Sequence, residues 1–191
     1  MPATALPPID PTAAQRWQHS PRLMASASPW LHEEVARRMA ERLDWIRMQP
    51  ERWLAWEPLR GGLQAHQALL SRYVNSQAWV QSAHGAKTEQ ALREAGKADS
   101  ALGRFAAMWR KNRNTLGLPD APVQMLWANM QLHAEPTPEA RLAQWHGLLA
   151  VEGFLMFSCL GPDSLLELRA VYQAMGWPVP AQPFTDMHDW G

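Results

Sequence analysis

Residues 52–73, RWLAWEPLRGGLQAHQALLSRY, begin with a short tryptophan-rich apolar run and end in a segment with helical spacing. Between them stands WEPLRGG, 56–62, in which a glutamate and a proline precede the two glycines. A strand, a loop and a helix in this order form the unit in which nucleotide-binding folds place a glycine-rich ligand loop. The stretch therefore raises two alternatives, a cofactor loop or an ordinary turn.

The rest of the chain repeats this alternation of short apolar runs and amphipathic segments. The clearest helix is predicted at 28–50, where Ser28 can cap the first turn and Pro50 ends the helix. Its apolar residues fall on one face at helical spacing: Leu31, Val35, Met39, Leu43 and Ile46. Strands are predicted at 53–56, 78–83, 123–129 and 153–160, and further helices at 63–73, 87–97, 138–150 and 164–176. Residues 98–121 are ambiguous, with a helix predicted at 100–112. This order predicts an α/β fold with parallel strands buried on both faces.

Composition limits the class of protein. The 191 residues are 47% hydrophobic and 19% charged, which suits one globular domain with a proper core. We predict an irregular leader at 1–27, with at most one short turn near 12–18, and a domain at 28–191. Eighteen basic and eighteen acidic residues balance, so nothing favours nucleic acid as a partner. The single cysteine, Cys159, and the lack of a signal peptide or a membrane-length apolar run predict a cytoplasmic protein.

Four segments carry a likeness to a known family: LHEEVARRMAERLDWIRMQPERWL at 31–54, VQMLWANMQLH at 123–133, LAQWHGLLAVEGFLMFSCLGPDSLLELR at 142–169 and FTDMHDWG at 184–191. In order and spacing they resemble the malonyl-ACP O-methyltransferase of biotin synthesis, a class I S-adenosylmethionine (SAM)-dependent methyltransferase. The resemblance implies a Rossmann-like, mostly parallel sheet that binds SAM at the carboxyl ends of its first strands. It also implies methylation of the free carboxyl of malonyl-ACP, with acyl carrier protein as partner.

The cofactor residues of that family fall on positions with altered chemistry. Its Asp-Leu-Gly-x-Gly-x-Gly loop places Ala55 at the aspartate, Glu57 and Leu59 at the first two glycines, and Gly61 at the third. A side chain at the first two positions would fill space that the ligand needs.

The family's acidic residue after the second strand is also missing, because Ser82 and His84 stand in that stretch, whereas Asn129 matches the family's asparagine. The candidate cofactor-binding residues are thus Glu57, Gly61, Ser82, His84 and Asn129, and no catalytic residue is identified. Two functions stay open: a SAM-dependent methyltransferase, or a cofactor-free pseudo-methyltransferase that acts as a protein-interaction module.

The resemblance also implies a difference at the carboxyl end. The family continues past DMHD into a helix and a final antiparallel hairpin, which this sequence does not contain. We therefore expect 153–160, GFLMFSCL, to form an exposed apolar sheet edge. Three explanations stay open: a protein partner covers the edge, a homodimer covers it, or the sequence is that of a truncated gene product.

Other motifs have simpler interpretations. HEEVA at 32–36 lacks the second histidine of a zinc site, because Ala36 stands there. Loop hydrogen bonds and capping account for Asp186, His188 and Asp189 better than a metal does. Cys159 is interpreted as a buried small residue rather than a nucleophile. A basic and aromatic group is interpreted as a solvated helix face: Arg104, Phe105, Trp109, Arg110, Lys111 and Arg113.

Overall fold

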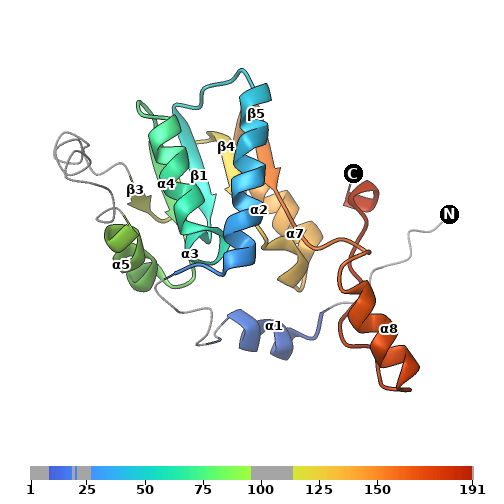
Figure 1. The fold of residues 1–191 in the computed structure, drawn as a ribbon. Coiled ribbons are helices and arrows are strands. Elements are labelled where there is room, and N and C mark those ends of the chain that lie inside the picture. Colours follow the sequence, from blue (N-terminus) through green and yellow to red (C-terminus); the bar gives the residue numbers. More distant parts are fainter. Residues whose placement is uncertain (1–8, 19, 21–26, 96–113, 191) are drawn as a thin grey trace.

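The computed structural model describes residues 9–18, 20, 27–95 and 114–190. At its centre lies a five-stranded sheet in the order β3-β2-β1-β4-β5, and every strand pair is parallel (Figure 1). The strands are β1 Arg52–Trp56, β2 Gln77–Gln81, β3 Asn114–Leu116, β4 Val123–Ala128 and β5 Leu149–Phe157. The predicted α/β fold with a Rossmann-like parallel sheet is confirmed.

Most helices cover the sheet or connect its strands, and the first and last of the α-helices lie away from it (Figure 1). They are α1 Pro11–Gln18, α2 Trp30–Glu41, α3 Pro58–Gly61, α4 Leu63–Arg72, α5 Gly85–Ala95, α7 Pro138–Gly147 and α8 Leu166–Ala174. Short 3-10 turns lie at Arg42–Trp45, Leu132–Ala134 and Met187–Trp190.

Alternate residues of β1 point to opposite faces of the sheet. Trp53 and Ala55 join the core cluster under α2 and α4, whereas Leu54 and Trp56 join the cluster that contains Trp145 of α7. Both faces are therefore apolar, as expected for parallel strands covered on two sides.

The face that α2 buries agrees with the predicted one at Met39 but differs toward the start of the helix. Its buried residues are His32, Ala36 and Met39, whereas Leu31 is 43% exposed. Ala36 leaves room for a close approach, since a Cβ added to Gly62 would lie 3.0 Å from the Cβ of Ala36. The helix is thus rotated toward the loop after β1.

Two further predictions about local structure are corrected, and one strand was missed. Ser28 does not cap α2, whose N-cap is Pro29 without a side-chain hydrogen bond. The leader contains the eight-residue helix α1 rather than a short turn. Strand β3 was not predicted, because its three residues carry no apolar alternation. The predicted helix at 100–112 and the basic and aromatic group between Arg104 and Arg113 lie outside the described residues.

Strand β5 forms one edge of the sheet, and it starts earlier than predicted. Its first residues, Leu149 and Ala150, were assigned to the preceding helix. A register shift against β4 follows, where Gly153 packs so closely that an added Cβ would lie 2.9 Å from the Ala150 carbonyl oxygen. None of the nine β5 residues is fully buried. The edge strand expected at 153–160 is therefore present, although it spans 149–157 and its residues 153–157 are half-buried.

Helix α8 stands apart from the sheet and its covering helices (Figure 1). None of its residues is buried. Among the described residues, no helix is long and apolar enough to cross a membrane.

Candidate functional site

The carboxyl ends of β1, β2 and β4 meet at one edge of the sheet. Chain order reverses beside β1, since β2 and β3 lie on one side of it and β4 and β5 on the other. In open α/β sheets a ligand crevice forms outside the strand ends at such a reversal. The sequence candidates Glu57, Ser82, His84 and Asn129 all follow these three strands.

The loop after β1 is a helical turn rather than an open glycine-rich cradle. Glu57 takes the left-handed conformation, with φ 51° and ψ 52°, and Pro58–Gly61 then form α3. All four α3 residues are buried. A Cβ added to Gly61 would lie 3.0 Å from the carbonyl oxygen of Asn129. Because Gly61 has no side chain, the backbone at the end of β4 can pack directly against it.

Glu57 sends its carboxylate across to the end of β2. The hydroxyl of Ser82 donates to Glu57 Oε2 at 2.9 Å, and the backbone N–H of Ala83 donates to Oε1 at 2.5 Å. Ser82 also shares a hydrogen bond with Thr88 at 2.8 Å and accepts one from the backbone of His84 at 3.1 Å. The structure therefore joins two sequence candidates, Glu57 and Ser82, to each other.

Asn129, the candidate after β4, is fully buried. Its amide nitrogen donates to the carbonyl oxygens of His32, at 2.8 Å, and Gly61. Its amide oxygen accepts from the hydroxyl of Ser158 at 2.6 Å. Asn129 therefore connects α2, α3 and the end of β5.

The start of α2 packs against the same region. The Ser28 hydroxyl donates to the carbonyl oxygen of Leu59 at 2.8 Å and accepts from the backbone N–H of Leu63, also at 2.8 Å. His32 Nδ1 lies 2.7 Å from the carbonyl oxygen of Arg60. These contacts hold the helical turn α3 against α2.

Glu33 supplies an anion to the first turn of α4. Its two carboxylate oxygens accept from the backbone N–H groups of Gln64, at 3.1 Å, and Ala65, at 3.4 Å. Free N–H groups and the helix dipole make such a terminus a favourable place for negative charge. The carboxylate of Glu33 therefore occupies the N-terminus of α4.

These contacts test whether SAM fits the site that the resemblance implies. Glu57 and Leu59 stand where glycines would leave space, and both are buried. Gly62 follows directly after Gly61. A Cβ on Gly62 would lie 3.2 Å from Glu33 Oε2, so this glycine also packs against protein atoms. In this conformation the protein's own atoms occupy the positions at the strand ends.

A cluster of basic groups lies beside the filled loop, and sequence reasoning missed it. Burial lowers the pKa of Arg60, and the carboxylates of Glu57 and Glu135 partly oppose that shift. Burial, together with the charges of His32 and Arg60, lowers the pKa of His133 to about 4. Burial also lowers the pKa of His32. The only signal for Arg60 in the sequence is its charge, since the residues on either side of it in the loop are a leucine and a glycine.

The remaining chemical candidates form local contacts. His188 contacts Asp186 Oδ1 through its Nδ1 at 2.6 Å, and the Asp189 N–H donates to the Asp186 carbonyl oxygen. Cys159 is half-buried and packs against the cluster around Trp145. A groove of about 840 Å³ between α2 and α4 includes Trp30, Arg37 and Arg38 in its lining. It opens on the helical layer rather than at the strand ends.

The strand order and the all-parallel pairing match the Rossmann-like fold of SAM-dependent methyltransferases. The plantazolicin methyltransferase BpumL, solved with an analogue and SAH, matches with a TM-score of 0.51 at 12% identity, over 81% of this chain and 60% of that one. A Nostoc punctiforme protein assigned as an O-methyltransferase matches with a TM-score of 0.52 at 15% identity, over 100% of this chain and 56% of that one. These likenesses concern the fold.

Sequence comparison gives the more particular likeness, to malonyl-[acyl-carrier protein] O-methyltransferases. The protein of Laribacter hongkongensis is 34% identical over 165 residues, which are 84% of this chain and 54% of that relative. The protein of Methylovorus sp. is 33% identical over 86% of this chain and 55% of that relative. The resemblance inferred from the sequence is confirmed. The chain spans about half the length of the curated relatives it matches. No protein-family model matches the chain.

Proposed function

We propose that this chain is a non-catalytic relative of the malonyl-ACP O-methyltransferases and acts as a protein-interaction module. One observation carries the proposal: its own side chains, Glu57 and Glu33, occupy the loop and the helix terminus where this fold receives a cofactor. Methyl transfer depends on alignment of the methyl group with its acceptor, so loss of the cradle removes the reaction while the fold persists.

The second candidate is SAM-dependent methylation of the malonyl-ACP carboxyl. The 34% identity to the Laribacter hongkongensis protein favours it. In that case SAM would be the cofactor and acyl carrier protein the partner. The start of α2 would have to move away from α3, which breaks the contacts of Ser28, His32 and Glu33.

Calorimetric titration with SAM separates the two candidates. We expect no heat of binding at millimolar SAM, because binding would have to displace Glu33 and Glu57 from satisfied hydrogen bonds. BpumL, which was solved with SAH, serves as the positive control. Micromolar binding of SAM to this chain would overturn the non-catalytic proposal.

The partner surface that we propose combines β5 with the separate helix α8. Leu166, Leu168 and Val171 of α8 are between 42% and 54% exposed. The stretch 153–160 contains no charge that would discourage edge pairing. We propose that a second copy of the chain covers this surface, and the balanced net charge gives two copies no reason to repel each other.

Charged substitutions on α8 test this surface. Val171→Glu with Met175→Lys changes two side chains that are 54% and 58% exposed, so the fold of one copy should persist. We expect the substitutions to weaken self-association by at least about tenfold, through charge burial at the interface. Sedimentation equilibrium measures the dissociation constant.

A matched pair on α5, Ala86→Glu with Gln90→Lys, adds the same charges at the same spacing on another exposed helix. This control should associate like the unchanged chain. A chain that stays monomeric at high concentration, or a dimer that the α8 substitutions leave intact, would refute this surface.

A further inference from the structure

Helix α8 ends in a Schellman motif that turns the chain back along the helix. Gly176 takes the left-handed conformation, with φ 67°, and its N–H donates to the carbonyl oxygen of Gln173 at 3.1 Å. The N–H of Trp177 donates to the carbonyl oxygen of Tyr172 at 2.9 Å. This end brings the two aromatic side chains together, because the rings of Tyr172 and Trp177 meet edge to face with their centroids 5.3 Å apart.

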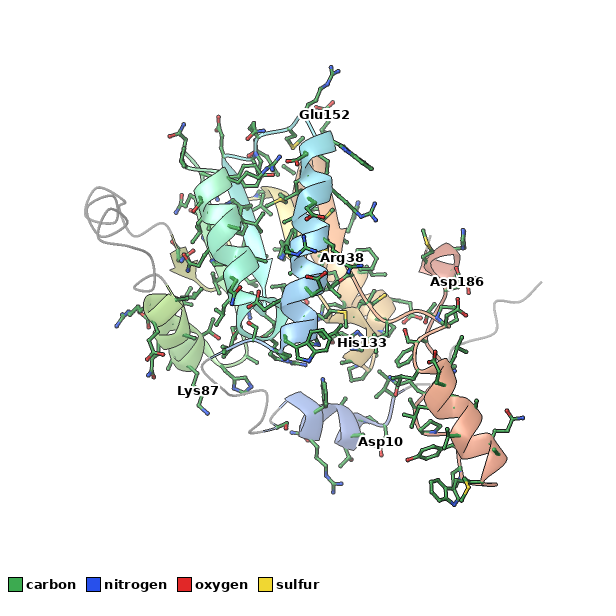
Figure 2. The ribbon with its side chains drawn as sticks, in the orientation of Figure 1. Asp10, Arg38, Lys87, His133, Glu152 and Asp186 are labelled. Atoms are coloured by element: carbon green, nitrogen blue, oxygen red, sulfur yellow. The ribbon has the colours of Figure 1, made fainter. Side chains whose placement is uncertain are left out.

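The segment that returns from this turn, residues 177–184, is held at two places. Nη2 of Arg169 on α8 donates to the carbonyl oxygen of Gln182 at 2.9 Å, and Gln182 Nε2 donates to the carbonyl oxygen of His133 at 3.1 Å. The ring of Phe184 lies 5.4 Å from the Arg169 guanidinium and meets the His133 ring edge to face at 6.2 Å. Figure 2 shows His133 at the end of the sheet opposite to Glu152. The returning segment is therefore fixed both to α8 and to the carboxyl end of the sheet.

A hollow of about 320 Å³ lies between α8 and the returning segment. The rings of Tyr172 and Trp177 line it together with the aliphatic side chains of Val179 and Pro183. Arg169 is the charged residue of this lining, which contains no acidic residue within the described part of the chain. The ion pairs of the described residues all involve other basic side chains. The hollow thus combines apolar surface with one cation that no carboxylate of the described residues neutralises.

We propose that this hollow binds a small aromatic carboxylate. The guanidinium of Arg169 has five N–H groups, and its bond to Gln182 leaves others for the oxygens of a carboxylate. The perpendicular rings of Tyr172 and Trp177 favour a planar ring as the body of the ligand, through offset or edge-to-face contact.

Charge and size narrow the ligand further. Paired aromatic rings can also bind an organic cation, but the charge of Arg169 would repel one. A volume of about 320 Å³ is at the lower end for ligand pockets and suits a single substituted ring. The hollow lies apart from the filled loop after β1. It also uses other α8 residues than Leu166, Leu168 and Val171, so the proposal does not depend on the proposed function.

Titration with benzoate, followed by NMR of the ligand signals, tests the proposal on the full chain. We expect saturable binding with a dissociation constant of about 1 mM or lower. Benzamide keeps the ring without the charge, and acetate keeps the charge without the ring, so each should bind at least about tenfold more weakly. Absence of saturation, or benzamide or acetate that binds as tightly as benzoate, would overturn the proposal.

Two substitutions assign the binding to this hollow. Arg169→Met should weaken benzoate binding by at least about tenfold and leave benzamide binding unchanged, because it removes the charged donor. Trp177→Ala should weaken the binding of both ligands, and its side chain is 52% exposed, so the fold should persist even where Arg169→Met loosens the returning segment.

Arg42→Met and Trp45→Ala are the matched controls, since both residues are exposed and lie outside the hollow. Both control variants should bind benzoate like the unchanged chain. Benzoate affinity that stays the same in Arg169→Met and in Trp177→Ala would place the binding elsewhere and refute the site.

Discussion

Asn129→Asp is expected to lower the free energy of unfolding by about 3–5 kcal/mol, the range typical of an uncompensated buried charge. In the structure, the amide nitrogen of Asn129 donates to the carbonyl oxygens of His32 and Gly61. A carboxylate has no hydrogen to donate, so one of its oxygens would face these two carbonyl oxygens in a fully buried position. Urea unfolding followed by tryptophan fluorescence measures the change.

Asn75→Asp is the control for this substitution, because Asn75 is exposed in the turn before β2. Its effect should stay within about 0.5 kcal/mol. If Asn129→Asp also changed stability by less than about 1 kcal/mol, Asn129 would not be the connection between α2, α3 and β5 that its contacts indicate.

The second large effect is a loss of stability in mild acid. Burial lowers the pKa of both His66 and His133 from 6.5 to about 4. Between these two values the unfolded chain binds a proton at each histidine and the folded chain does not. Protonation therefore favours unfolding, and the stabilisation is complete above pH 6.5 and is lost as the pH falls toward 4. Each histidine contributes about 3 kcal/mol to this loss.

His66→Leu tests one of the two equal contributions to that acid effect. His66 is fully buried, and its ring is tilted against that of Trp53 with the ring centroids 5.2 Å apart. Its Nε2 contacts the Asn114 side-chain oxygen at 3.1 Å. Leucine cannot bind a proton, so the variant should lose about half of the pH dependence between 6.5 and 4. Unfolding free energies across this range give the slope.

His146→Gln serves as the control for the acid effect, because His146 is exposed on α7 and its removal should leave the slope unchanged. Equal slopes for His66→Leu and the unchanged chain would rule out His66 as a source of acid sensitivity.

Several elements were predictable because their residues carry a strong local pattern. Trp53 to Trp56 and Val123 to Ala128 are apolar runs of strand length, and both became buried strands. Strand β3 was missed because Asn114, Thr115 and Leu116 are too few to show a period, and pairing with β2 alone makes them a strand.

The site was less predictable because its contacts cross between distant segments. The sequence indicated that Glu57 would disturb a cofactor loop, but not that its carboxylate would bind at Ser82, 25 residues away. Ser28 has the chemistry of a helix cap, yet the structure directs its hydroxyl to Leu59 and Leu63. Helical periodicity predicted Leu31 rather than His32 on the buried face. Periodicity carries no information on the close contact between Ala36 and Gly62, which sets how the helix packs.

The strand order has a consequence for how fast the chain folds. β1 pairs with β2 across about 25 residues, but its other neighbour is β4, and Arg52 contacts Gln124 across 72 residues. The chain must close this long loop before the central strand gains its second partner, and such non-local pairing slows folding. During synthesis, one side of β1 therefore stays unpaired until residues up to Ala128 have emerged from the ribosome.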